Sequence, residues 1–217
     1  MHGAEVYAPD IANNWRTDWA NRSYYDRLWT PEEMHKGDAL MTNQRGVALA
    51  LSFADCVPIV FHDPVQQVIG IAHGGWRGTA RGVVMATVDA MRERFGSQPH
   101  DILAGIGPSI GTCCYEVSEQ VRDLFLGTQQ FETMPTQERY RDAVYTSATF
   151  STVQLADRES LRLDLGETNR KQLLFAGLTP EHIEVSGVCT SCHVDNFFSH
   201  RREHGKTGRF PVIIALS

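Results

Sequence analysis

The sequence has no long apolar run, no surplus of basic residues and no even set of cysteines. Its apolar stretches fall well short of the roughly 20 residues that a helix needs to cross a bilayer. The first residues, Met-His-Gly-Ala-Glu-Val, lack both the basic and the apolar region of a secretory signal. We therefore expect a cytoplasmic protein without a membrane-spanning segment.

The shortage of basic residues limits the classes of partner that the protein is expected to bind. Lys and Arg total 20 against 26 Asp and Glu, which gives a formal net charge of −6. Nucleic acids and anionic membranes both attract basic surfaces, so we expect neither as a partner. Five cysteines are an odd number and too few for a disulfide framework in 217 residues. In a reducing compartment their remaining roles are metal binding, nucleophilic catalysis and packing.

The rest of the composition, 42% hydrophobic and 21% charged, is typical of a globular protein that can bury a sizeable core. Short apolar segments at 47–53, 56–61 and 68–72 predict buried strands. The turn signal at 62–64 predicts that the second and third of these strands form a hairpin. Pro58 indicates that the second strand lies at a sheet edge or contains a bulge.

Further along the chain, helix and strand signals alternate. Apolar residues at helical spacing, followed by a glycine stop, favour a helix over 79–95. This order indicates an α+β fold with mixed and antiparallel sheets packed in layers with flanking helices. We expect a single domain over 1–217 with an irregular excursion at 8–37. The other expected elements are helices at 117–126 and 163–175 and strands at 101–106, 183–188 and 210–216.

Cys56 and His73 stand at the open end of the predicted hairpin. Cys56 begins its strand and His73 ends the next, so antiparallel pairing brings the two close together. A thiolate beside an imidazole forms either a nucleophile–base pair or two ligands of a zinc site. The alternative is a buried cysteine beside a hydrogen-bonded histidine. The neighbouring Asp55 is a candidate general acid or base, or else a residue that caps the turn.

The segment His73-Gly-Gly-Trp-Arg-Gly continues this candidate site. A strand end, two glycines and a helix start direct backbone N–H groups outward. Arg77 adds a planar cation suited to phosphate or carboxylate. A second basic cluster contains Arg201, Arg202, Lys206 and Arg209, opposed by the single acid Glu203. Nearby aromatics and glycine turns favour an anion or nucleoside pocket over a solvated loop.

The other four cysteines form two pairs. We interpret Cys113 and Cys114, which follow a glycine-rich loop, as small buried residues. Cys189-Thr-Ser-Cys192-His193 fits the pattern of c-type haem attachment and also half of a zinc knuckle. We favour neither, because haem attachment requires export and a knuckle needs a second pair, for which only Cys113 and Cys114 are available.

Several motifs occur together in one order. They are Ala-Asp-Cys-Val-Pro-Ile, Ala-His-Gly-Gly-Trp-Arg-Gly, Gly-Pro-Ser-Ile-Gly with a following Tyr-Glu-Val, Cys-Thr, and Phe-Phe-Ser-His-Arg-Arg with a following Thr-Gly-Arg. This combination closely resembles the YfiH-type family, whose members were long called laccase-domain or multicopper polyphenol oxidases and are now described as purine nucleoside phosphorylases. The resemblance runs from residue 2 to the C-terminus.

The resemblance implies a zinc ion held by two histidines and one cysteine. The cysteine of Ala-Asp-Cys is Cys56. One histidine is His73, followed here by Gly74 where the family has alanine, and the other is His2 in Met-His-Gly. Family members carry a longer segment before this histidine, so we expect the chain to be N-terminally truncated relative to the family.

The implied activity is phosphorolysis of adenosine, inosine and methylthioadenosine to the free base and ribose 1-phosphate, together with adenosine deamination. Zinc with three protein ligands leaves a position for acidified water, which suits deamination. Phosphorolysis needs a phosphate beside the anomeric carbon, held by Arg77 or by the cluster of Arg201, Arg202 and Arg209. The expected partners are a small-molecule nucleoside and phosphate, and the expected state is a monomer or small homo-oligomer.

Three other functions remain open. A site of two histidines and one cysteine also holds copper, which fits a polyphenol oxidase. However, a multicopper enzyme needs clustered histidines, and the nine here are scattered without a His-x-His pair. Cys56 and His73 could instead serve a hydrolase that edits peptidoglycan precursors. The last alternative is a truncated, inactive binding module.

Overall fold

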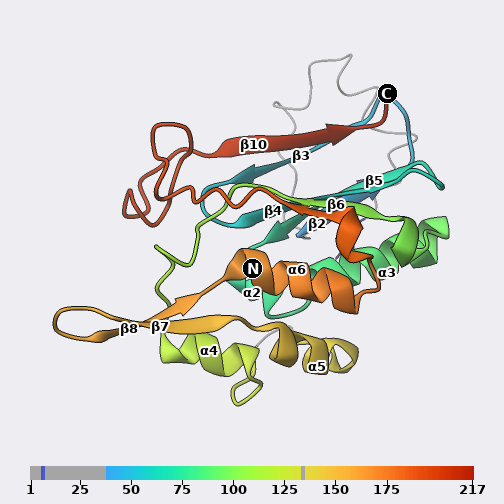
Figure 1. Cartoon of the computed structure of the whole chain (residues 1–217). Coiled ribbons are helices and arrows are strands. Elements are labelled where there is room, and N and C mark those ends of the chain that lie inside the picture. The colour runs from blue at the N-terminus through green and yellow to red at the C-terminus, as the bar shows by residue number, and fades with distance from the viewer. Residues whose placement is uncertain (1–5, 8–37, 133–134) are drawn as a thin grey trace.

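The largest sheet is mixed and carries the predicted hairpin at its centre. The structure is a computed structural model that describes residues 6–7, 38–132 and 135–217 (Figure 1), so the excursion expected at 8–37 lies outside it. In the described ranges this sheet has six strands, with parallel pairing only at its two outer pairs. Their order is β1 (Val6–Tyr7), β2 (Ala39–Thr42), β5 (Val68–Gly74), β4 (Val57–Asp63), β6 (Leu103–Ile106) and β9 (Ile183–Val185).

Two antiparallel pairs complete the sheets of the described chain. The first joins β3 (Ala48–Phe53) to β10 (Phe210–Ala215), and the second joins β7 (Phe150–Gln154) to β8 (Glu159–Leu163). The β3–β10 pair covers one face of the large sheet, as Figure 1 shows. The C-terminal strand thereby returns to the region of the predicted hairpin.

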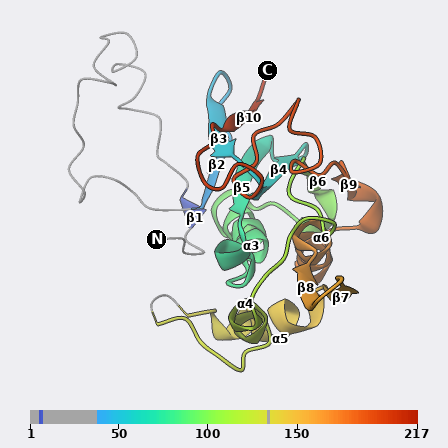
Figure 2. The ribbon, with the colours of Figure 1, turned by 90° about the vertical axis from the view of Figure 1, so that its left-hand side faces the viewer.

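Helices cover the opposite face of the large sheet (Figure 2). The helix α3 (Val83–Phe95) packs on β5 and on α6 (Leu165–Phe175), while α4 (Glu119–Phe125) and α5 (Glu138–Ser147) lie farther from the sheet. No helix in the described ranges is long and apolar enough to span a membrane. The predicted α+β class with layered mixed and antiparallel sheets is confirmed.

Alternation along β5 builds a core on both faces of the sheet. Ile69 and Ile71 pack with Leu49 and Phe53 under the β3–β10 pair. Val68 and Ala72, on the opposite face of β5, belong to the core cluster that includes the helices. Because β5 is buried on both faces, the hairpin that ends at His73 is held on a rigid support.

Two expectations about this region were wrong. The helix predicted over 79–95 is two helices, α2 (Trp76–Thr79) and α3, because Gly82 adopts a left-handed φ of 79° between them. The strand containing Pro58 is internal, lying between β5 and β6. Proline fits there because it is the second residue of β4 and its carbonyl still accepts a hydrogen bond from the Gly107 backbone N–H at 2.9 Å.

Candidate functional site

Most of the predicted site residues meet in one cavity of about 540 Å³ at the open end of the β4–β5 hairpin. This volume lies within the range of small-molecule sites. Arg202 is outside the lining, in the turn where its backbone N–H donates a hydrogen bond to Ser199 Oγ at 3.1 Å. His2 lies outside the described residues. The predicted residues in the lining are Asp55, Cys56, His73, Arg77, Arg201 and Arg209.

The side chains of Cys56 and His73 both lie next to Gly75. Cys56 precedes β4, and His73 pairs with Pro58 near the end of β5. A Cβ atom added at Gly75 would lie 3.1 Å from Cys56 Sγ and 3.7 Å from His73 Nε2. The sulfur and the ring nitrogen therefore both lie next to Gly75, on the side where another residue would carry its Cβ. A cysteine and a histidine in this arrangement could both bind one metal ion.

The surroundings of each of these side chains are fixed. The His73 ring stacks on Phe53 with centroids 4.9 Å apart. Burial, followed by the charges of Asp55 and Asp38, raises the pKa of the Cys56 thiol to about 11. Without a metal the thiol is therefore protonated at neutral pH and is not an activated nucleophile. Metal binding at this position has to displace the proton.

Asp55 is buried and connects three segments of the chain. Its Oδ1 accepts a hydrogen bond from Thr190 Oγ1 at 2.7 Å, and its Oδ2 accepts one from the Arg201 backbone N–H at 2.6 Å. Its own carbonyl accepts a hydrogen bond from the Ile110 N–H at 2.9 Å. These contacts give Asp55 a positioning role, and its acid–base role stays a prediction.

Two arginines of the lining, Arg77 and Arg201, lie over aromatic rings. The Arg77 guanidinium lies 4.2 Å from the centroid of the Trp76 ring. The Arg201 guanidinium lies 5.2 Å from the Tyr115 ring and donates a hydrogen bond to the Glu116 carbonyl at 2.8 Å. Stacking limits the freedom of both cations, and the hydrogen bond limits Arg201 further, which favours a defined anion site.

Glu203, the single acid of the second basic cluster, folds its own loop. Its Oε2 accepts hydrogen bonds from the Ser199 N–H at 3.0 Å and from Thr207 Oγ1. The hydrogen bond from Thr207 and that from Ser199 lower the pKa of the Glu203 carboxyl. The acid thus stabilises the loop that presents Arg201 and Arg209.

Sequence reasoning missed three aromatic members of the lining, which are Trp76, Tyr115 and His200. Each stands inside a motif already identified, next to a predicted residue or to a cysteine. Burial raises the pKa of the Tyr115 hydroxyl, so this group remains a hydrogen-bond donor at neutral pH. The signal that could have found them is the presence of flat side chains beside cations, which suits a planar base.

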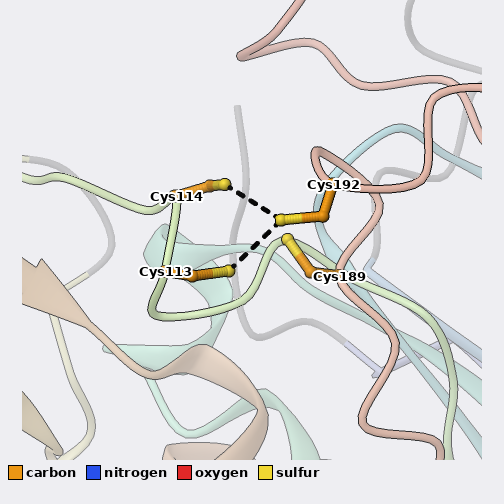
Figure 3. Close-up of side chains that lie close together, drawn as sticks. All are labelled: Cys113, Cys114, Cys189 and Cys192. Atoms are coloured by element: carbon orange, nitrogen blue, oxygen red, sulfur yellow. Dashed lines mark hydrogen bonds between the residues drawn. The ribbon is translucent and has the colours of Figure 1, made fainter.

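A second group of potential metal ligands is formed by the remaining four cysteines (Figure 3). Their sulfur atoms all lie within 4.8 Å of one another, so this cluster could bind a metal ion. The expectation that Cys113 and Cys114 are simply buried was wrong. Cys113, which lies in a loop, is exposed, and Cys114 is only partly buried at the margin of the core.

Comparisons with known proteins identify curated relatives of this chain. The chain is 41% identical over 179 residues to purine nucleoside phosphorylase YlmD of Bacillus subtilis, covering 82% of this chain and 58% of that protein. It is 45% identical over 178 residues to YlmD of Geobacillus stearothermophilus, covering 82% and 59%. The chain therefore spans about three fifths of the length of these curated relatives.

A solved structure extends the likeness to the whole fold. The crystal structure of the hypothetical protein YfiH from Bacillus licheniformis matches with a TM-score of 0.76 and 38% identity. The match covers 100% of this chain and 72% of that one. The family model described as multi-copper polyphenol oxidoreductase laccase matches residues 1–217. The chain therefore belongs to this laccase-domain family, the YfiH-type family.

Proposed function

We propose that this chain carries the active site of a zinc-dependent purine nucleoside phosphorylase. The observation that carries the proposal is the convergence of Cys56 Sγ and His73 Nε2 beside Gly75, in a cavity bordered by arginines. The names of the relatives support the same reaction class. The proposed substrates are a purine nucleoside and inorganic phosphate.

The proposed zinc ligands are Cys56, His73 and His2. Cys56 Sγ and His73 Nε2 both lie close to Gly75, and a thiolate with imidazoles is a donor set that zinc prefers. A zinc ion bound there would supply an open coordination position and acidified water. Copper also accepts these donors, so the identity of the ion is a part of the proposal that metal analysis decides.

In phosphorolysis, an oxygen of phosphate bonds to C1′ of the ribose while the bond from C1′ to the purine nitrogen breaks. The electron pair of that bond goes to the purine, which takes up a proton, and ribose 1-phosphate remains. Arg77, Arg201 and Arg209 would bind the phosphate and orient it toward C1′. Trp76 and Tyr115 would contribute aromatic contacts to the base.

We further propose that the chain accepts several purine nucleosides. Adenosine, inosine and methylthioadenosine would share the ribose and phosphate contacts and differ only at the base or at C5′. Adenosine would also be deaminated, with water adding at C6 and ammonia leaving. Both activities then depend on the same cavity, so a substitution that removes Cys56 abolishes both.

The test is an assay of the purified, zinc-loaded chain with inosine and phosphate. We expect free hypoxanthine and ribose 1-phosphate in equal amounts, and neither product when phosphate is omitted. Cys56→Ser should abolish the reaction. Absence of base release by folded protein with zinc bound at Cys56 would overturn the proposal.

The same preparation tests the alternatives. Oxidation of a phenol that rises with added copper, without nucleoside turnover, would favour the polyphenol oxidase that the family description names. A covalent adduct on Cys56 in metal-free protein would favour a Cys–His hydrolase. The raised pKa of the Cys56 thiol makes that last outcome unfavourable at neutral pH.

A further inference from the structure

The four remaining cysteines come from two loops that are distant in sequence. Cys113 and Cys114 lie in the loop after β6, and Cys189 and Cys192 lie in the loop after β9. The strands β6 and β9 are parallel neighbours, so the loops that follow them leave the sheet at the same edge. The Ser109 N–H donates to the Val188 carbonyl at 3.2 Å and ties the loops together.

The spacing of the sulfur atoms fits a metal centre better than disulfides. Cys192 Sγ lies 3.5 Å from Cys113 Sγ and also 3.5 Å from Cys114 Sγ (Figure 3). A disulfide needs about 2.05 Å between its sulfurs and can join Cys192 to only one partner. Four thiolates arranged as a tetrahedron around zinc, at about 2.3 Å from the metal, lie about 3.8 Å from one another.

The backbone around the cluster is arranged for thiolate ligands. The Gly111 N–H donates to Cys189 Sγ at 3.2 Å, and such donors stabilise negative charge on sulfur. A Cβ at Gly111 would lie 3.2 Å from Cys189 Cβ and 3.3 Å from Cys113 Sγ, so the glycine leaves room for the cluster. The N–H of Cys192 donates to the Cys189 carbonyl at 3.2 Å and closes the turn that presents both sulfurs.

We propose that Cys113, Cys114, Cys189 and Cys192 bind a structural zinc ion, separate from the site at Cys56 and His73. Four thiolates form a closed tetrahedral site without a position for substrate, as in structural zinc centres. Soft sulfur ligands select zinc over the hard cations magnesium and calcium. Binding deprotonates the thiols and joins the two loops through the metal.

This zinc site stabilises the two loops that contact Asp55 in the candidate active site. Ile110, just before Cys113, donates its N–H to the Asp55 carbonyl, and Thr190, between Cys189 and Cys192, donates its hydroxyl to Asp55 Oδ1. The two loops that the zinc joins are therefore the two loops that Asp55 bridges. The proposal itself does not depend on which reaction the cavity catalyses.

The first test is the zinc content in a Cys56→Ser background, where only the four-cysteine site remains. We expect about one zinc per chain, and its loss on adding Cys113→Ser or Cys192→Ser. Both side chains are exposed, so these substitutions should leave the chain folded. The matched control is Asp195→Asn, at an exposed residue near Cys192, which should retain the zinc.

A second readout identifies the ligands without a variant. Replacing zinc by Co²⁺ in the Cys56→Ser protein should give the intense charge-transfer absorption of a tetrahedral tetrathiolate site. Chelation should lower the melting temperature of this protein and leave that of its Cys192→Ser derivative unchanged. Unaltered zinc content in Cys113→Ser and Cys192→Ser, or a Cys114–Cys192 disulfide in protein purified under reductant, would overturn the proposal.

Discussion

The backbone N–H of Arg201 donates a 2.6 Å hydrogen bond to Asp55 Oδ2 across 146 positions of the sequence. This bond fixes the start of the basic loop to the residue that precedes Cys56. The candidate metal ligand Cys56 and one arginine of the lining, Arg201, are thus positioned by the same aspartate. Asp55 itself has a left-handed φ of 82°, a conformation that aspartate and asparagine tolerate better than most residues.

Asp55→Ala should destabilise the fold by about 2–4 kcal/mol, because it leaves the buried Thr190 hydroxyl and the Arg201 N–H without their acceptor. Asp55→Asn keeps one acceptor oxygen and tolerates the positive φ, so it should cost less. Urea denaturation measures both. A change below about 0.5 kcal/mol in Asp55→Ala, similar to that of an exposed surface substitution, would show that the bridge is unimportant.

Gly75→Ala should weaken metal binding at the cavity while leaving the fold stable. Its Cβ would lie 3.1 Å from Cys56 Sγ and close to His73 Nε2, whereas the φ of −69° suits alanine. Zinc titration and thermal melting separate the two effects. The control is Gly166→Ala, whose Cβ would meet only Asp164 Oδ1, at 3.6 Å. Full zinc affinity in Gly75→Ala would contradict the proposed position of the ion.

Arg201→Ala should raise the KM for phosphate by about 10- to 100-fold, in line with a lost hydrogen bond to a charged group worth about 1.5–3 kcal/mol. The matched control is Arg202→Ala, because Arg202 is the next residue but is outside the cavity lining. Its phosphate KM should stay within about twofold of the parent value, below the tenfold change of 1.4 kcal/mol. Equal effects of the two substitutions would indicate a nonspecific electrostatic role.

Alkylation of Cys56 in metal-depleted protein should increase with pH up to about 11. The folded environment raises the pKa of this thiol, mainly by burial, so the reactive thiolate is scarce at pH 7 and accumulates only as the pH approaches that value. Peptide mass spectrometry after iodoacetamide treatment measures the alkylation of Cys56 separately from that of the other cysteines. The same residue in urea-unfolded chain should react at lower pH, and identical profiles would disprove the shift.

Local patterns in the sequence were enough to predict that Cys56 and His73 lie close together. The hairpin of β4 and β5 is formed by adjacent segments, so the meeting of Cys56 with His73 follows from strand pairing alone. The helix α6 and the strand β10 were also predicted within a few residues. The break at Gly82 was missed, because a glycine inside an apolar helical pattern does not reveal its φ.

Long-range topology supplied what the sequence pattern could not. The pairing of β6 with β9 brings Cys114 to Cys192, and neither loop on its own contains a complete set of metal ligands. The sequence pattern likewise predicts no structure for the polar segment that forms α5 and the β7–β8 hairpin. Their positions depend on packing against distant residues, such as the hydrogen bond from Tyr140 Oη to Asp89 Oδ2 at 2.6 Å.

Anomalous scattering at the zinc edge, from crystals of zinc-loaded protein, tests the central claim most directly. We predict a peak in the space beside Gly75, within bonding distance of Cys56 Sγ and His73 Nε2, and its absence in Cys56→Ser crystals. Cys56 and His73 pointing apart, with no peak between them after zinc soaking, would contradict the account.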